Sequence, residues 1–241
     1  MKYGVQMYAI RTLCSKDLEA GIKAAAEIGY NGLEFAGFFN HSAEEVAGWL
    51  KKYGVEAMGA HVAIEAIVDA DNTIAFHKAI GNKRIICPWA DLKTEADVDK
   101  LVEQMNSVKA KYEEAGMELY YHNHAHEFVK DGDKYLIDLL AEKMPDLKLE
   151  FDAYWVYRGG ECPLAYLKKY EGRTGIFHFK DGTMEDGTLA GEGNVDLKAV
   201  CDYAKANNFD WAVVESEATD DLDEQVAAIR ADLAYLKSIA D

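Results

Sequence analysis

The chain of 241 residues lacks any apolar run that approaches the roughly 20 residues needed to span a bilayer. Its first residues, MKYGVQMYAIR, begin a strand-like pattern and lack the apolar core and cleavage site of a signal peptide. Cysteine is also scarce, since the four cysteines lie far apart and form no CxxC pair. Such isolated cysteines indicate free thiols in a reducing compartment rather than disulfides or a zinc knuckle. We therefore expect a cytoplasmic protein with no membrane span.

Basic residues are in the minority: 26 Lys and Arg stand against 43 Asp and Glu, which gives a formal net charge of −17. This charge would repel a polyanion such as DNA, and no basic run offsets it. A P-loop is missing too, and the short pattern Gly191–Glu192–Gly193 is more typical of a turn than of a phosphate site. We expect no nucleic-acid partner. No pattern indicates an oligomeric state, so a homo-oligomer stays open.

Linkers, low-complexity segments and close repeats are absent as well, so one domain is expected over residues 1–241. The chain instead alternates eight short β-rich runs with amphipathic helical stretches. This alternation predicts parallel strands joined by helical crossovers. The count of eight and the lack of hairpin turns between the strands favour a closed α/β barrel, the (β/α)8 TIM barrel, over an open doubly wound sheet. The predicted strands are 3–10, 32–37, 56–62, 84–89, 117–124, 147–155, 175–181 and 211–217.

Several helix ends carry local signals. Gly29 and Gly54 follow helical patterns and fit C-terminal caps. Ser42 and Glu45 are spaced as a capping box. Pro163 suits the first turn of a helix.

Polar and aromatic residues stand at the C-terminal ends of the predicted strands, where barrels of this kind carry their active sites. Because side chains alternate along a strand, residues two apart face the same way. Burying such polar and charged groups without partners costs free energy. A divalent cation would compensate them and so explain why they lie together. The residues are Glu34, His61, Trp89, His122, His124, Asp152, Trp155, His178, Lys180, Glu215 and Glu217.

Four of these residues could hold one divalent cation through nitrogen and oxygen. Such a mixed set suits Mn, Zn, Co or Fe better than Ca or Mg, and does not decide among the four. Taken singly, each residue is more often a structural hydrogen-bonding group, but four on consecutive strands favour a metal. His126 and Glu127, which follow the fifth strand, are expected to be structural loop residues. The predicted ligands are His122, Asp152, His178 and Glu215.

The segments GVQMYAIR, GYNGLEFAG, YYHNHAHEF, LEFDAYWV, FHFKDG, GEGNVD and VVESE resemble the sugar isomerase/epimerase superfamily of xylose isomerase-like TIM barrels. The resemblance covers nearly the whole chain. It implies one metal held by Glu, Asp, His and Glu at the ends of strands five to eight, and the last three match Asp152, His178 and Glu215. His122 stands where the first Glu is expected. This HNH variant resembles a branch with inosose dehydratase-like proteins and proteins that act on 3-keto-glycosides.

The resemblance implies proton abstraction next to a carbonyl, through an enediolate that the metal stabilises. Returning the proton gives isomerisation or epimerisation, whereas expelling a β-leaving group gives elimination. In the superfamily, glutamates on strands five and eight act as an acid/base pair, which His122 cannot repeat unchanged. The first prediction is a metal-dependent isomerase or epimerase of a keto-sugar or cyclitol. The alternative is a lyase, either a dehydratase or a 3-keto-glycoside eliminase.

The remaining site residues receive roles on the same basis. The candidate catalytic groups are His124, Lys180, Glu215 and Glu217. The residues expected to bind the sugar are Glu34, His61, Trp89 and Trp155. Lys180 could instead form a surface salt bridge with Asp181, and either tryptophan could instead be a core residue.

Two other classes of function stay open at lower weight. Cleavage of abasic DNA in the manner of endonuclease IV needs extra histidines and a basic groove, and the seven histidines and the charge of −17 speak against it. A non-catalytic sugar-binding barrel would leave the four predicted ligands unexplained.

Overall fold

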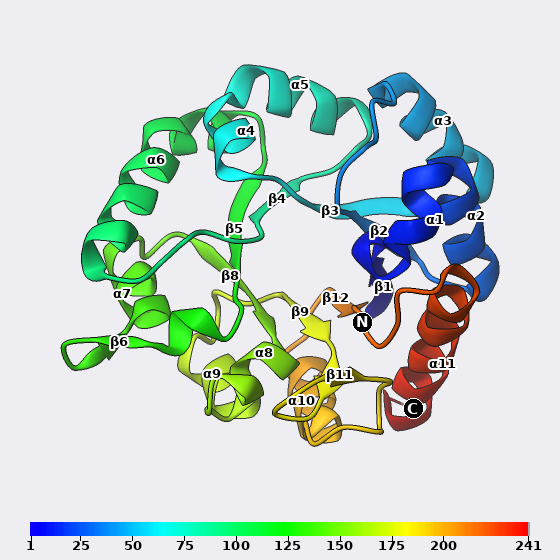
Figure 1. Cartoon of the computed structure of the whole chain (residues 1–241). Helices are drawn as coiled ribbons and strands as arrows, with labels where there is room; N and C mark the ends of the chain where they lie inside the picture. Colours follow the sequence, from blue (N-terminus) through cyan, green and yellow to red (C-terminus); the bar gives the residue numbers. More distant parts are fainter. Residues whose placement is uncertain (241) are drawn as a thin grey trace.

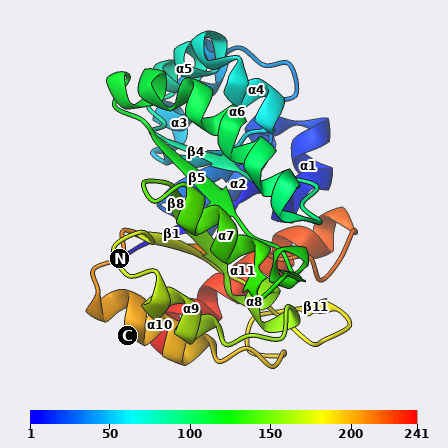
Figure 2. The same ribbon diagram turned by 90° about the vertical axis from the view of Figure 1, so that its left-hand side faces the viewer.

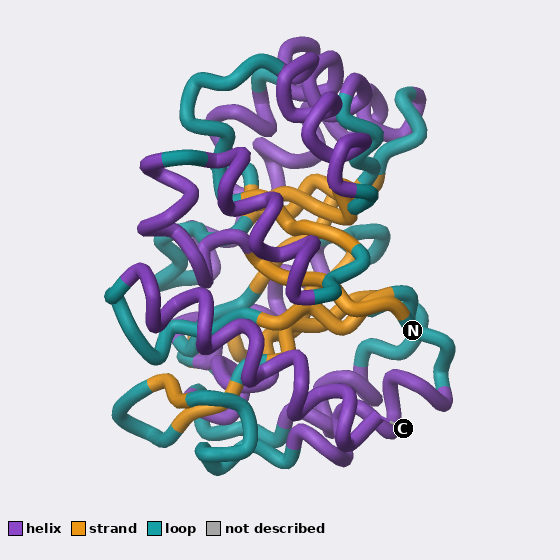
Figure 3. Tube along the Cα trace, turned by 90° about the vertical axis from the view of Figure 1, so that its right-hand side faces the viewer, coloured by secondary structure: helices purple, strands orange, loops and turns teal. Residues whose placement is uncertain are grey.

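Eight parallel strands close into a barrel in the computed structural model, which describes residues 1–240. Neighbouring strands follow the order β1-β12-β9-β8-β5-β4-β3-β2, and the helices surround them (Figures 1 and 3). The predicted fold class is confirmed. The barrel strands are β1 (Lys2–Gln6), β2 (Gly32–Phe35), β3 (Glu56–His61), β4 (Arg84–Cys87), β5 (Glu118–His122), β8 (Lys148–Asp152), β9 (Ile176–Phe179) and β12 (Trp211–Val214).

The helices form the outer layer, and their apolar faces pack on the outward side chains of the strands. They are α1 (Arg11–Lys16), α2 (Leu18–Ile28), α3 (Ala43–Tyr53), α4 (Ile64–Val68), α5 (Ala70–Ala79), α6 (Glu95–Glu114), α7 (Leu136–Lys143), α8 (Ala153–Arg158), α9 (Pro163–Lys169), α10 (Leu197–Ala206) and α11 (Leu222–Ala240), with the 3-10 helices η1 (Met7–Ile10) and η2 (His126–Phe128). Among the described residues, no helix is long and apolar enough to cross a membrane.

The predicted helix ends are confirmed. Gly29 and Gly54 end α2 and α3 in the left-handed region, with φ of 106° and 70°. Ser42 and Glu45 form the capping box of α3, and Pro163 opens α9.

A second, smaller apolar cluster fills the inside of the barrel. Its members include Trp211 and Ile176, the first residues of β12 and β9, so it lies toward the start of the strands. The Trp211 ring packs over Gly32, where a Cβ would come within 2.6 Å of it. This plug leaves the C-terminal ends of the strands as the place for polar groups. The whole cluster is Met58, Ile86, Tyr120, Ile176, Trp211 and Val213.

All eight predicted strands extend past the observed strand ends, and 3–10 and 147–155 do so because a helix begins there. β1 ends at Gln6, whose side-chain oxygen accepts a hydrogen bond from the Tyr8 N–H (3.0 Å). β8 ends at Asp152, whose Oδ1 accepts one from the Trp155 N–H (2.9 Å). Both side chains act as N-caps and turn the chain into a helix. Trp155 therefore lies in α8. The sequence had predicted Trp155 at the end of a strand, and that prediction is wrong.

Two short hairpins lie in the loops that follow barrel strands, and neither belongs to the barrel (Figure 2). They pair β6 (Lys130–Asp131) with β7 (Lys134–Tyr135) and β10 (Asp181–Gly182) with β11 (Gly187–Thr188). In the second, the Asp181 carboxylate accepts the backbone N–H groups of Gly182, Gly191, Gly193 and Val195. The Gly191–Glu192–Gly193 segment is thus a turn fixed by Asp181.

Arg173 joins the end of α7 to the start of β8. Its guanidinium donates to the backbone oxygens of Ala141 (2.8 Å), Met144 (2.9 Å) and Leu147 (2.7 and 3.0 Å). Arg173→Met leaves these oxygens without their donor, and we expect it to lower the free energy of unfolding by about 2 kcal/mol in urea denaturation. The exposed Arg230 is the matched control, and Arg230→Met should cost less than about 0.5 kcal/mol. Equal losses in the two variants would contradict this role.

Candidate functional site

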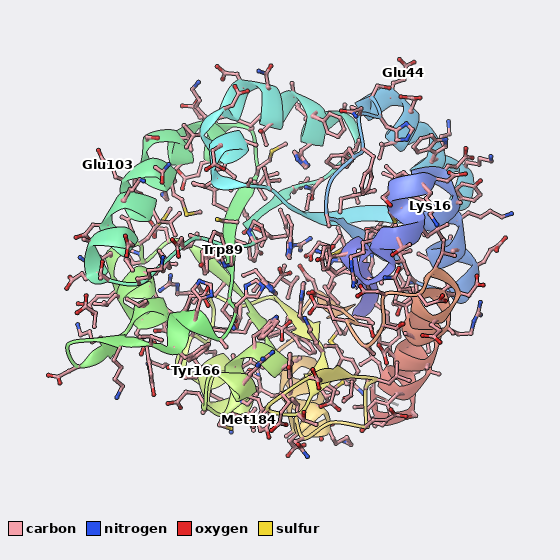
Figure 4. The ribbon with its side chains drawn as sticks, in the orientation of Figure 1. Lys16, Glu44, Trp89, Glu103, Tyr166 and Met184 are labelled. Atoms are coloured by element: carbon pink, nitrogen blue, oxygen red, sulfur yellow. The ribbon has the colours of Figure 1, made fainter. Side chains whose placement is uncertain are left out.

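A cavity of about 360 Å³ opens at the C-terminal ends of the strands. Trp89 lies inside the ring of helices, on the side of the barrel near β5, whereas Glu44 and Glu103 lie on the outer helices (Figure 4). Trp89 is 52% exposed, so it is available to a ligand and is not a core residue. The lining residues are Tyr8, Ala36, His61, Pro88, Trp89, His122, His124, Glu215 and Glu217.

The four predicted metal ligands, His122, Asp152, His178 and Glu215, come together as an outer cluster. Each offers a ligand atom, and these atoms lie within 4.8 Å of one another. His178 Nδ1 lies 2.5 Å from an oxygen of Glu215 and 3.7 Å from one of Asp152. All four side chains are buried.

The outer cluster contains buried polar atoms without hydrogen-bond partners, as a cation site would. Asp152 Oδ2, His178 Nδ1 and Glu215 Oε2 make no hydrogen bond of acceptable geometry, although His178 Nδ1 and Glu215 Oε2 lie only 2.5 Å apart. Leaving such atoms unpaired is costly, and a divalent cation would satisfy all three at once. The residues present therefore fit the metal that the sequence predicts.

Asp152 owes its position to both of its neighbours. Its Oδ1 caps α8, which leaves Oδ2 free to face His178. Its backbone N–H donates to Asn123 Oδ1 (3.1 Å), so the buried Asn123 of the HNH segment ties β5 to β8. The HNH pattern thus contains one candidate ligand, His122, and one structural amide.

An inner cluster of Glu34, His61, Glu150 and His178 lies directly against the outer one. His178 Nε2 approaches Glu34 (2.8 Å) and Glu150 (3.3 Å), and His61 Nε2 approaches the same two carboxylates (3.1 and 3.2 Å). Glu34 also accepts a hydrogen bond from the Gln6 amide (2.5 Å). Glu34 is fully buried behind His178 and does not line the cavity, so the structure does not support the predicted direct contact with the sugar.

Glu150 is the site residue that sequence reasoning missed. It precedes Asp152 by two residues in β8, and alternation along the strand places both side chains on the inner face. This spacing of two residues from Asp152 could have indicated Glu150 as a site residue. The carboxylate is fully buried, with Oε1 lacking any hydrogen-bond partner.

Burial and neighbouring charges set the protonation of the inner cluster. Burial and the Glu34 charge raise the pKa of Glu150 to about 7. Burial opposes the charged form of His61, but Glu34 and Glu150 outweigh it and raise the pKa of His61 to about 9. Burial also opposes ionisation of Glu34, yet His61 and His178 hold the pKa of Glu34 well below its usual value. The two buried carboxylates therefore favour a positive charge on the groups between them.

Lys180 supplies a fixed positive charge beside the outer cluster. Its Nζ lies 3.4 Å from Glu215 and 3.1 Å from Glu217, and 4.7 Å from the centre of the Trp155 ring. Burial opposes its charge, but Glu215 and Asp152 raise the pKa of Lys180 above its ordinary value. The alternative of a surface salt bridge with Asp181 is wrong, because Lys180 is only 1% exposed.

His124 and Glu217 are the other cavity residues able to move a proton. Burial lowers the pKa of His124 to about 3, so this imidazole is neutral. Burial and the charge of Glu215 raise the pKa of Glu217 even though Lys180 opposes the shift. Trp155 packs on His124, with ring centres 5.1 Å apart, and lies outside the cavity wall.

His126 and Glu127, which we expected to be structural loop residues, make hydrogen bonds to groups around the loop. With His124 they form a third group whose ligand atoms lie within 4.8 Å of one another. The buried Glu127 accepts hydrogen bonds from the Tyr121 hydroxyl (2.7 Å) and the His124 N–H (2.8 Å). His126 Nε2 contacts the backbone oxygen of Ala90 (2.9 Å). Both side chains are engaged away from the two clusters.

A second cavity, of about 400 Å³, adjoins the first, since Tyr8 and Ala36 line both. Tyr8 and Phe39 are 45% and 41% exposed there, and the Arg11 guanidinium lies 4.7 Å from the Tyr8 ring centre. Phe39 has a φ of 50°, which is rare for a residue with a bulky side chain. This loop thus holds an aromatic side chain at the edge of the second cavity.

Known proteins resemble this chain in sequence and in fold. It is 27% identical to inosose dehydratase from Clostridium beijerinckii over 154 residues, which are 55% of this chain and 51% of the relative. The chain thus matches about half the length of this curated relative.

Solved structures share the fold over the whole chain. A sugar phosphate isomerase/epimerase from Parabacteroides distasonis aligns with a TM-score of 0.86 at 20% identity, covering 100% of both chains. The IolI protein, whose structure holds a zinc atom, aligns with a TM-score of 0.80 at 17% identity, covering 100% of this chain and 98% of that one.

The sequence pattern of one family matches residues 22–239, which is most of the chain. The match agrees with the closed barrel of eight parallel strands and with the polar groups at their C-terminal ends. This chain belongs to the xylose isomerase-like TIM barrel family.

Proposed function

We propose that this protein is a metal-dependent enzyme that removes a proton next to the carbonyl of a keto-sugar or cyclitol. The outer cluster carries the proposal, because four buried candidate ligands come within 4.8 Å of one another beside a cavity that two of them, His122 and Glu215, line. His122, Asp152, His178 and Glu215 would hold the cation. A divalent ion there supplies a Lewis acid that stabilises negative charge next to the carbonyl.

Glu217 is the residue best placed to accept the proton. It lines the cavity, its side chain is 29% exposed, and its raised pKa makes it a stronger base than an ordinary carboxylate. Lys180 holds it in place and stays protonated itself, so Lys180 acts as a positioning charge. The neutral His124 has a low pKa and is the weaker base, suited to orienting a hydroxyl group.

The cavity wall opposite Glu217, which β1 to β4 contribute, bears on the choice between epimerisation and a reaction with one base. An epimerase needs a second proton donor on the other face of the substrate. Of the described residues that line the cavity from β1 to β4, only Tyr8 and His61 can titrate, and His61 Nε2 faces the inner carboxylates. A reaction with one base is therefore favoured over epimerisation.

Elimination is the reaction that we favour. Glu217 takes the proton from the carbon next to the carbonyl, the electron pair of that C–H bond forms a C=C bond, and the C–O bond to the β-oxygen breaks. The leaving oxygen then receives the proton from Glu217, which restores the base. The second cavity provides room for a leaving group larger than water, such as the second sugar of a keto-glycoside. The resemblance to inosose dehydratase agrees with a lyase.

Isomerisation is the second candidate, since one base can also return the proton to the neighbouring carbon. The observation in its favour is that His124 and Glu217 line the same cavity from different strands, so two groups can serve two adjacent carbons. The similarity in fold to isomerases and epimerases is compatible with it.

The metal proposal makes a prediction for Asp152→Asn, which removes a charged ligand. We expect this variant to lose the divalent metal that depends on the outer cluster, measured by mass spectrometry of the purified protein. Asp232→Asn is the control, because Asp232 is a buried carboxylate in α11 that lies outside the candidate metal clusters. Unchanged metal content in Asp152→Asn, with the fold intact, would remove the basis of the proposal.

The reaction itself can be followed by NMR in D₂O with an inosose and with a 3-keto-glucoside. We expect exchange of the proton next to the carbonyl and release of water or of the second sugar, both abolished by a chelator. Formation of an isomer without any release would replace elimination by isomerisation. Absence of exchange with every keto-sugar tested would contradict both candidates.

Glu217→Gln tests the proposed base. Because general-base catalysis contributes about 10²–10⁴-fold, we expect kcat to fall by at least about 100-fold while the metal content stays unchanged. In the wild type, kcat/KM should rise with pH through a pKa above that of an ordinary glutamate, because only the ionised form accepts a proton. Glu185→Gln, at an exposed position outside the cavity, is the control. A loss confined to KM would argue against this role.

A further inference from the structure

We propose that the inner cluster is a second cation site, separate from the outer one and joined to it through His178. Its ligands would be Glu34, His61, Glu150 and His178 Nε2, which come from β2, β3, β8 and β9. The proposal concerns metal content and holds for any reaction that the outer site performs.

The distances within the inner cluster match a metal coordination shell. The four nitrogen–oxygen separations are 2.8, 3.1, 3.2 and 3.3 Å. With metal–ligand bonds of about 2.0–2.1 Å, neighbouring ligand atoms lie about 3.3 Å apart in a tetrahedral site and about 2.9 Å apart in an octahedral one. The four nitrogen–oxygen separations are therefore those expected between neighbouring ligands of a small divalent ion.

Hydrogen bonds alone account poorly for the same contacts. Each Nε2 carries at most one proton, yet each faces two carboxylates, so two protons would have to serve four short contacts. His61 and His178 stack at 12° with ring centres 5.5 Å apart, so both rings present Nε2 to the same two carboxylates. One cation between the carboxylates satisfies all four atoms.

His178 presents one nitrogen to each cluster. Nδ1 faces Asp152 and Glu215, and Nε2 faces Glu34 and Glu150. The two clusters therefore share this imidazole ring, and a cation in each cluster would bind a different nitrogen of it.

The inner cluster is also accessible and incompletely satisfied. His61 is 12% exposed and lines the cavity, which gives an ion a path inward. Glu34 Oε2 and Glu150 Oε1 are buried and lack hydrogen-bond partners. Two imidazoles and two carboxylates form a ligand set that suits Zn²⁺, which favours four ligands of this kind.

Zinc stoichiometry tests the proposal. The protein is stripped with a chelator, titrated with Zn²⁺, passed through gel filtration and analysed by mass spectrometry. We expect the wild type to bind about two equivalents, and Glu150→Gln and His61→Asn about one each. Asp232→Asn, a buried carboxylate in α11 outside both clusters, should keep about two equivalents and controls for loss of buried charge.

The outcomes separate this inference from the proposed function. One equivalent in the wild type, lost in Asp152→Asn and kept in Glu150→Gln and His61→Asn, would overturn the inner site and leave the outer site intact. No bound zinc in the wild type would overturn both. Circular dichroism melting of each variant shows whether it is folded, and His61→Asn, at the accessible edge, serves if Glu150→Gln is not.

Discussion

Buried charge at the C-terminal mouth of the barrel is the constraint on which the rest of the site depends. Asp152 and Glu215 on one side of His178, and Glu34 and Glu150 on the other, are carboxylates removed from water. Such groups are tolerated only when cations or hydrogen-bond donors compensate them. The protein itself supplies imidazoles and the Lys180 ammonium, and several oxygens still lack partners. In the proposed function, divalent cations would complete this compensation.

The barrel tolerates this concentration of charge because the charged groups lie apart from the apolar core. Trp211 and its neighbours fill the start of the barrel, so polar side chains gather only where the strands end. Alternation along each strand then sets the depth of each group. Glu150 lies one alternate position deeper than Asp152 in β8, and Glu217 lies one beyond Glu215, toward the cavity. The site therefore extends from the buried inner carboxylates, through the predicted metal ligands, to the more exposed Glu217.

Much of this arrangement follows from the sequence, because strand period and strand ends are local properties. Alternating strands and helices were enough to predict the barrel, and the strand ends were enough to bring Asp152, His178 and Glu215 together. Two features were not local. The end of β8 depends on Asp152 acting as a helix cap, which moved Trp155 into α8. The role of Glu150 depends on side chains from β3 and β9, which no single segment of the sequence contains.

The most direct test of the central claim is anomalous diffraction at the zinc edge from crystals grown with Zn²⁺. The account predicts a peak within bonding distance of Asp152, Glu215 and His178 Nδ1, at the wall of the cavity. A protein that diffracts well, with these side chains ordered and no anomalous peak between them, would contradict it.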